Sequence, residues 1–489
     1  MQGIGKKLGL LVVVLSVVAA TAAAGSFSAQ QAQCNGTKPA SATAKYNTYN
    51  NTIPAPNPKA KNYGQSKAGS CIYKGAGYFN LNLNKCPSDW NNRQGITNTS
   101  INLWTSMPHS GALAVYGGIG DGMKAYFNYV NARGGIAGRK INVDIFDDQL
   151  APDITRKNAD EAIQGRKYAA SFAILGTSNN LAIWDRMNQQ CMPQLMTASS
   201  DDQFTDTDTH PWTTLFGLSL YNETQLWVTW LKTRFPNGGK IAIVQIDNGQ
   251  GRVLAAGVRR AIRGSNFSIV ASERHPGTAA TIRDQITNVA ASNADIFLVL
   301  EAGSFCIQAL AGIERTSWRP DAVIVANSCA QISTVFQPLL SQGATGNNTR
   351  MIRYYYVPTD EDSTNNAFER VYTASVRGQG LNPADAQVAN GWFWGWYVVQ
   401  VLKDASLMKG GLNRANITVA THQYESQWPL MMAGVKAKTR GKLDAFPFEA
   451  GQMYRYTGAS GNNVGRFVKD GPLVNNEGML KNWANIING

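Results

Sequence analysis

The stretch NARGGIAGRKINVDIF, residues 131–146, joins a helical pattern to a strand pattern. Before it, apolar side chains recur at helical spacing from Met123 to Val130, and its last six residues are typical of a strand. Gly134-Gly135 suits the end of the helix, and Gly138 suits a turn into the strand. We therefore predict a helix followed by a strand, the repeating unit of a parallel α/β sheet.

The same alternation continues along the chain and supplies too many strands for one sheet. Short apolar strands are also predicted at residues 101–104, 173–175, 194–196, 240–244, 267–270, 296–300, 322–325 and 353–356. The longest helical pattern between them, residues 221–235, separates two series of strands, which predicts two α/β lobes with a crossover before it and another near residues 351–357. We expect lobe 1 to comprise residues 98–217 and 356–445, and lobe 2 residues 218–355 and 446–489.

Length and composition agree with more than one folded domain. The chain has 489 residues, whereas single cores usually stop growing at about 250–300 residues. Apolar residues make up 44% and charged residues only 16%, which excludes a disordered, solvating protein. The net charge of +13 is spread over scattered Lys and Arg residues, so it is interpreted as a diffuse surface property and no nucleic-acid partner is expected.

The first 29 residues are predicted to be a secretory signal peptide. Lys6 and Lys7 precede an apolar stretch, residues 8–20, and small residues follow at 22–26. The alternative, an uncleaved anchor, is disfavoured because the apolar stretch is shorter than the roughly 20 residues of a spanning helix. We expect cleavage between residues 24 and 29 and export to the periplasm or cell surface. Residues 30–97, rich in Asn, Lys, Gly, Ser, Thr and Pro, are predicted to form a loop-rich leader.

All six cysteines lie beyond the predicted signal peptide. In an oxidising compartment we expect disulfides, and short separations favour Cys71 with Cys86 and Cys306 with Cys329 among the fifteen possible pairings. Cys191 and one other cysteine could instead be buried free thiols. No CxxC occurs and no cysteine is paired with a histidine at metal-ligand spacing, so neither zinc, another metal nor a cofactor is expected.

Motifs for catalysis are missing from the sequence. The four histidines show no HExxH spacing, there is no GxSxG, and Gly239-Lys240 is followed by Ile241 rather than by the Ser or Thr of a phosphate-binding loop. Asp147 and Asp148 are adjacent, and neighbouring residues of a strand point to opposite faces, which favours a strand-end turn over an acid–base pair. The protein is not expected to be an enzyme.

Four segments together resemble the opening of the branched-chain amino-acid-binding proteins of bacterial ABC importers. These segments are residues 106–111, Tyr116-Gly117, residues 131–140 and Asp147-Asp148. The resemblance covers roughly residues 95–470. It implies a type I periplasmic-binding-protein fold, with two doubly wound Rossmann-like lobes joined by three crossovers. It also implies a small-molecule ligand held between the lobes, an ABC transporter permease as partner, and no chemical reaction. A ligand-sensing surface protein of the same fold is a weaker alternative.

The resemblance also implies where the ligand lies, and general principles agree, because ligands of open α/β sheets bind beyond the carboxyl ends of the strands. Tyr116 matches the family's pocket tyrosine, and Ser178 matches a serine whose hydroxyl and amide bind a carboxylate. The remaining candidates follow other strands or begin helices, and they are Asn179, Ser199, Ser200 and Asp201 in lobe 1 and Gln250 and Asn327 in lobe 2.

Three positions depart from the family pattern. Asp201 stands where amino-acid binders carry a threonine, Gln250 stands at an aromatic position, and Asn327 or Ser328 replaces a glutamate that binds an ammonium group. The expected ligand is an amino acid or a similar compound, with an aromatic acid, an amide or another metabolite as the alternative. The aromatic run at residues 391–397 is interpreted mainly as core, although Trp392 could reach the cleft.

Overall fold

The computed structural model describes residues 34–41, 51–111, 113–360, 363 and 366–481. The predicted signal peptide, residues 1–29, lies outside these described residues. None of the helices in the described part of the chain is long and apolar enough to cross a membrane.

Lobe 1 is built on a parallel five-stranded sheet in the order β5-β4-β6-β7-β8. The second strand of the lobe, β5, lies on one side of the first, β4, and the later strands lie on its other side, which is the doubly wound order. The strands are β4 Ser100–Met107, β5 Lys140–Asp147, β6 Ala170–Phe172, β7 Gln194–Thr197 and β8 Thr213–Leu215. The helices are α2 Gly118–Asn131, α3 Pro152–Gly165, α4 Thr177–Gln189, α10 Ala367–Arg377, α11 Ala386–Leu407 and α12 Arg414–Thr421.

Lobe 2 repeats this order and extends it. Its seven-stranded sheet runs β10-β9-β11-β12-β13-β16-β17. The first five strands are parallel to one another, β16 is antiparallel to β13, and β17 is antiparallel to β16. The strands are β9 Gly239–Ile246, β10 Phe267–His275, β11 Ile296–Leu300, β12 Ala322–Val325, β13 Thr349–Arg353, β16 Ala450–Thr457 and β17 Arg466–Asn475. The helices are α5 Leu220–Arg234, α6 Gly249–Ala261, α7 Arg283–Ala291, α8 Ser304–Glu314 and α9 Gln337–Ser341.

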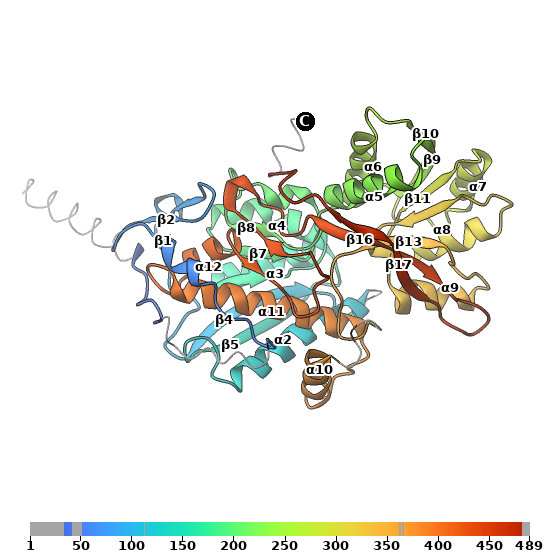
Figure 1. Cartoon of the computed structure of the whole chain (residues 1–489). Coiled ribbons are helices and arrows are strands. Elements are labelled where there is room, and N and C mark those ends of the chain that lie inside the picture. The colour runs from blue at the N-terminus through green and yellow to red at the C-terminus, as the bar shows by residue number, and fades with distance from the viewer. Residues whose placement is uncertain (1–33, 42–50, 112, 361–362, 364–365, 482–489) are drawn as a thin grey trace, which may run out of the picture.

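Three segments cross between the lobes side by side. Leu218 in the first crossing forms a β-bridge with Phe448 in the third. Tyr354 in the second crossing places its ring 4.9 Å from the Phe448 ring. The predicted fold of two doubly wound lobes joined by three crossovers is thus confirmed, and Figure 1 shows the two lobes next to each other with β16 and β17 running into lobe 2.

Two predicted strands lie elsewhere than expected. The strand predicted at residues 173–175 is β6, which ends at Phe172, and Ala173 has a left-handed φ of 57° that breaks the strand. The strand predicted at residues 353–356 ends at Arg353, because the following tyrosines leave the sheet to form the second crossing. The Tyr355 ring stacks on Phe393 of lobe 1, and the Tyr354 ring packs against Phe448 of the third crossing.

Helix α11 is the central helix of lobe 1. Every residue from Gly391 to Leu407 is buried, as expected for a helix that is covered on all sides. It touches α2 backbone to backbone, because a Cβ on Gly391 would lie 2.2 Å from the carbonyl oxygen of Ile119. Trp392 is fully buried, with its ring 5.0 Å from that of Tyr126. The aromatic run therefore belongs to the core, and Trp392 packs there instead of reaching the cleft.

The leader forms a small layer on lobe 1 that the sequence did not predict. It contains a three-stranded antiparallel sheet, β1 Gly64–Gln65, β2 Ile72–Lys74 and β3 Asn80–Asn82, and the 3₁₀ turns Pro58–Asn62 and Leu83–Lys85. Polar contacts join it to α11, since Lys403 Nζ donates to the Pro54 carbonyl over 2.6 Å and the Asn57 amide donates to Asp404 Oδ1 over 2.6 Å.

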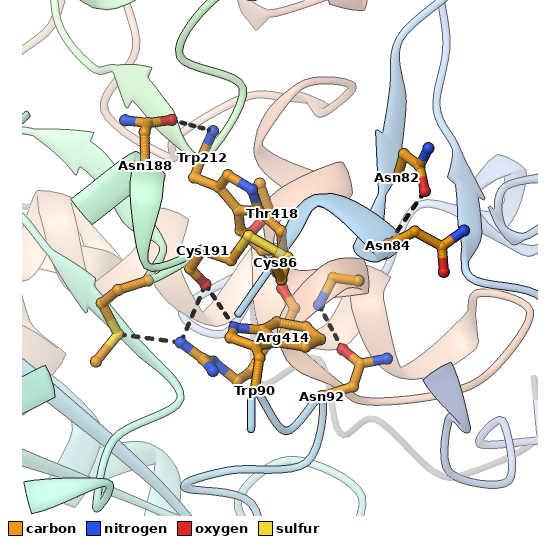
Figure 2. The surroundings of a disulfide bond; sticks show 12 residues. Asn82, Asn84, Cys86, Trp90, Asn92, Asn188, Cys191, Trp212, Arg414 and Thr418 are labelled. Carbon is orange, nitrogen blue, oxygen red and sulfur yellow. Dashed lines mark hydrogen bonds between the residues drawn. A yellow bond between two sulfur atoms is a disulfide. The ribbon is translucent and has the colours of Figure 1, made fainter. Parts of the chain in front are cut away.

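The disulfides correct one predicted pairing and confirm the other. Cys306 is bonded to Cys329, as predicted. The predicted bond between Cys71 and Cys86 is wrong, because Cys71 is bonded to Cys34 and Cys86 to Cys191. The physical reason is that Cys86 follows the turn that meets lobe 1, where Cys191 lies, so closeness in sequence did not decide the partner. Figure 2 shows the bond between Cys86 and Cys191.

Candidate ligand site between the lobes

A cavity of about 370 Å³ lies between the two lobes beside the crossings. Ser200 and Leu218 contribute from lobe 1 and the first crossing, and Asn327 contributes from the loop after β12. The other walls come from three segments. They are residues 330–333 and Gln337 of lobe 2, residues 351–355, 357 and 359–360 in and just after the second crossing, and residues 384, 386 and 390 at the start of α11. Groups from both lobes therefore face one partly open cavity of the size of a small ligand.

The second crossing supplies an aromatic wall. Tyr355 stacks on Phe393 at a centroid distance of 4.0 Å and donates from its hydroxyl to Asn390 Oδ1 over 3.1 Å. Tyr354 lies beside it, with its ring centroid 4.6 Å from that of Tyr355. Burial raises the pKa of both phenols above the ordinary value of a tyrosine, so both keep their protons and can act as hydrogen-bond donors.

A charged pair lies on the same wall. Arg353 Nη2 is 3.2 Å from Asp360 Oδ1, and both residues line the cavity. Asp360 Oδ2 also accepts from the Val357 amide over 2.7 Å. Arg353 thus presents a guanidinium, a planar group that can bind a carboxylate, at the edge of the aromatic wall.

The serines and the aspartate after β7 lie where lobe 1 meets lobe 2. Ser200 lines the cavity, and Ser199 Oγ hydrogen-bonds Thr177 Oγ1 over 2.8 Å. The Asp201 side chain is fully buried, its Oδ1 accepts from the Gln203 amide over 3.1 Å, and its Oδ2 has no partner among the described residues. A Cβ on Gly249, at the start of α6, would lie 3.8 Å from that oxygen, so a lobe 2 helix begins directly opposite this carboxylate.

The other lobe 1 candidates differ in their surroundings. Ser178 is exposed in the first turn of α4. The Asn179 amide is buried and donates to Thr155 Oγ1 over 2.7 Å, so it is already engaged inside lobe 1. Tyr116 is half-buried in the 3₁₀ turn Ala114–Gly117, and burial raises its pKa. None of these three lines the cavity that holds Ser200.

The lobe 2 candidates, Gln250 and Asn327, are both held by hydrogen bonds within lobe 2. Gln250 Nε2 donates to Ser328 Oγ over 2.7 Å, and Ser328 Oγ donates to the Glu301 carbonyl over 2.6 Å. The backbone amide of Asn327 donates to Glu223 Oε1 over 2.8 Å. Burial raises the pKa of Glu223 to about 8. Asn327 is therefore held in the cavity wall by α5, the helix that follows the first crossing.

Sequence reasoning missed a buried acid–base pair at the carboxyl ends of two lobe 2 strands. His275 ends β10, Glu301 follows β11, and His275 Nε2 is 3.0 Å from both carboxylate oxygens. Both side chains are buried, and burial raises the pKa of Glu301 to about 8. The sequence offered one signal for this pair, which is that the charged residue Glu301 directly follows the apolar run 296–300. Tyr354 and Tyr355 were missed because their segment was assigned to a strand.

Comparison with known families decides the relationship. The sequence profile described as "Periplasmic binding protein" matches residues 105–453. The chain belongs to this family. A comparison with curated protein sequences finds no match. This periplasmic binding protein carries three disulfides within the described residues, which fits the oxidising, extracytoplasmic compartment typical of the family.

Solved structures share the fold at low sequence identity. A fatty acid ABC transporter substrate-binding protein from Thermomonospora curvata has a TM-score of 0.64 at 17% identity, covering 78% of this chain and 94% of the other. A branched-chain amino-acid ABC transporter protein from Thermus thermophilus with bound valine has a TM-score of 0.62 at 15% identity, covering 78% and 98%. An R. palustris solute-binding protein in complex with 4-hydroxybenzoate has a TM-score of 0.61 at 14% identity, covering 76% and 96%.

Proposed function

We propose that this protein captures a small molecule between its lobes outside the cytoplasm and delivers it to the permease of an ABC importer. The observation that carries this proposal is the cavity of about 370 Å³ whose walls come from both lobes and from the crossings. A ligand in that position completes its contacts only when the lobes are closed, so it shifts the population toward the closed state. The permease would recognise that state, and no covalent bond is made or broken.

The lobes that move are proposed to be those expected from the sequence, residues 98–217 with 356–445 and residues 218–355 with 446–489. Export through cleavage of a signal peptide, residues 1–29, belongs to the same proposal. Three disulfides within the described residues support it, because such bonds persist in oxidising compartments.

We propose an amino acid or a similar compound as the ligand. The Asp201 carboxyl group lies where the lobes meet, outside the lining of the cavity, and its Oδ2 has no partner among the described residues. Arg353 offers a cation at the cavity wall. An ammonium group and a carboxylate on one molecule would suit these two charges. An aromatic carboxylic acid is the second candidate, favoured by the wall of Tyr354 and Tyr355 and by the 4-hydroxybenzoate bound to a structural relative.

The test is a thermal-shift screen of the purified protein with amino acids, aromatic acids and amides. A true ligand at 100 times its dissociation constant adds about 2.7 kcal/mol of stability. We expect one of these classes to raise the melting temperature, and isothermal titration calorimetry then gives the dissociation constant. A screen in which no compound of the three classes stabilises the protein would contradict the proposed ligand chemistry.

Single substitutions then test the site. Tyr116, Ser178, Gln250 and Asn327 are the contacts proposed from the sequence. Only Asn327 lines the cavity as it stands, so the other three are proposed to reach the ligand when the lobes close further. Ser178→Ala removes a hydroxyl donor. We expect a loss of about 1–3 kcal/mol, or roughly 5- to 150-fold in affinity. Ser268→Ala on the exposed side of β10 is the matched control. Unchanged affinity in both Ser178→Ala and Tyr116→Ala would exclude these two residues as ligand contacts.

A further inference from the structure

Three carboxylates meet at the end of the third crossing. Asp444 lies before the crossing, Glu449 lies at its end directly before β16, and Glu477 follows β17. Their carboxylate oxygens lie within 4.8 Å of one another. No sequence spacing indicated this cluster, because the third residue comes from a segment far along the chain. The cluster is outside the cavity between the lobes.

Two of these carboxylates are buried, and one has an oxygen without a hydrogen bond. The Asp444 residue is 6% exposed and Glu449 is 1% exposed. Glu449 Oε2 accepts from the Gly478 backbone amide over 2.7 Å, and the Leu480 backbone amide also interacts with this carboxylate, whereas Glu449 Oε1 has no hydrogen bond of normal geometry among the described residues. A buried carboxylate oxygen without a partner is costly in free energy. The position therefore favours a cation that would supply the missing partner.

Positive side chains near the cluster balance only part of its charge. Lys438 Nζ is 2.5 Å from Glu477 Oε1, on the outer side of the cluster, where the Glu477 side chain is one-third exposed. Arg440 also brings positive charge near Asp444, and its backbone amide donates to the Asp444 carbonyl over 2.6 Å.

We propose that Asp444, Glu449 and Glu477 form a calcium site. Carboxylate oxygens are the ligands of hard divalent cations. Oxygens bound to one Ca²⁺ at about 2.3–2.6 Å can be up to roughly 5 Å apart, whereas around Mg²⁺ the limit is roughly 4 Å. One oxygen from each of the three carboxylates lies within 4.8 Å of the others, which is within the span that one Ca²⁺ can bridge. Water would complete the coordination shell on the exposed side at Glu477.

The site would fasten the C-terminal segment to the third crossing. Backbone bonds already join them, since the Asn476 amide donates to the Glu449 carbonyl over 2.9 Å and the Ala445 amide donates to the Lys481 carbonyl over 2.7 Å. A cation shared by Asp444, Glu449 and Glu477 adds a link across the same junction. Calcium would thereby stabilise the junction between lobe 2 and the hinge independently of any ligand in the cleft.

The experiment uses the full mature protein, stripped with a chelator and titrated with CaCl₂ or MgCl₂ near neutral pH. Melting temperature and isothermal titration calorimetry are the readouts. We expect Ca²⁺ to bind with a dissociation constant in the range of about 10⁻⁴–10⁻³ M, as in extracellular calcium modules, and to raise the melting temperature more than Mg²⁺ does. Binding should weaken at acidic pH, because protons compete for the carboxylates.

Substitutions locate the binding. Glu449→Gln and Glu477→Gln should each weaken Ca²⁺ binding about tenfold or more, because each removes one charged ligand. Glu477→Gln alters a partly exposed side chain, so it remains informative if Glu449→Gln does not fold. Asp321→Asn, an exposed residue before β12, is the matched control and should bind as the unaltered protein does. Lys438→Gln should tighten binding, since it removes the competing ammonium.

Two results would overturn the calcium site. One is a protein whose melting temperature does not respond to Ca²⁺ although it depends on pH, because two of the carboxyl groups would then share a proton instead. The other is a Ca²⁺ response that Glu477→Gln leaves unchanged, because the ion would then bind elsewhere.

Discussion

Arg414 is a cation in the interior of lobe 1. Its guanidinium donates to the carbonyls of Ala169 and Cys191 over 3.1 Å each and to that of Asn91 over 3.3 Å. It also lies over the Trp90 ring, 4.8 Å from the centroid. Burial lowers its pKa to about 9. Figure 2 shows Arg414 and Trp90 beside the disulfide between Cys86 and Cys191.

Replacing Arg414 with methionine should destabilise the protein by about 3 kcal/mol or more. Methionine fills similar space but removes the guanidinium donor from three carbonyls, and each such loss costs about 1–3 kcal/mol. The Cys191 carbonyl keeps the Trp90 Nε1 donor and the Asn91 carbonyl keeps the Gln94 backbone amide, so the total loss lies toward the lower end of the summed range. Urea unfolding followed by tryptophan fluorescence measures the difference. Arg377→Met, on the exposed end of α10, is the control and should change stability little. An Arg414→Met protein as stable as the control would show that these bonds contribute nothing net.

At the residue scale, sequence reasoning located strand ends better than side-chain partners. Ser200 and Asn327 were predicted from their places after apolar strands, and both line the cavity. Asn179 was predicted by the same rule, yet its amide bonds Thr155, because a helix start can also face inward. The place of Tyr355 in the cavity wall could not be predicted from local sequence, since it depends on a stacking contact with Phe393 in a helix that comes later in the chain.

Among the elements, strands with continuous apolar runs were predicted correctly. β11 and β12 occupy the predicted residues 296–300 and 322–325, because strands buried on both faces carry no polar interruption. The leader strands β1, β2 and β3 were missed, since each is only two or three residues long. Their order depends on contacts with α12 and on disulfides, and neither is visible in local composition.

Removing the disulfide between the leader and lobe 1 should cost more than removing the one within lobe 2. Cys86 and Cys191 are 105 residues apart, and Cys306 and Cys329 are 23 apart. Loop-closure entropy predicts losses of about 4.7 and roughly 3 kcal/mol, respectively. Paired Cys→Ser variants, unfolded in urea, measure both values. The reverse order would indicate that native contacts rather than loop entropy set the contribution.

For the whole molecule, buried carboxyl groups should make stability fall as pH rises. Burial raises the pKa of Glu223, Glu301, Asp404 and Glu449 to about 8. A raised folded-state pKa gives stability that is fully present below the unfolded pKa of about 4 and is lost as pH rises through about 8. Burial also lowers the pKa of His422 to about 4. This shift makes stability fall as pH drops below about 6.5, which opposes the carboxyl groups, but it comes from one histidine against four carboxyl groups.

We therefore expect the melting temperature at about pH 8.5 to be a few degrees below that at about pH 5.5, in a chelator-containing buffer. Differential scanning calorimetry at constant ionic strength is the measurement. Glu223→Gln keeps the shape of one buried group without its titration and should reduce the slope. A melting temperature that rises steadily over this range would contradict the assignment of protonated carboxyls to the interior.

The position of α11 in the chain has a consequence for biosynthesis. This helix fills the centre of lobe 1 against α2, yet its residues, 386–407, are translated after most of lobe 2. A nascent chain therefore displays the apolar faces of β4 and α2 long before the helix that covers them exists. Such exposed surface is prone to aggregation. Lobe 1 can close only after translation has passed residue 407, and until then its first half depends on a chaperone or on remaining unfolded.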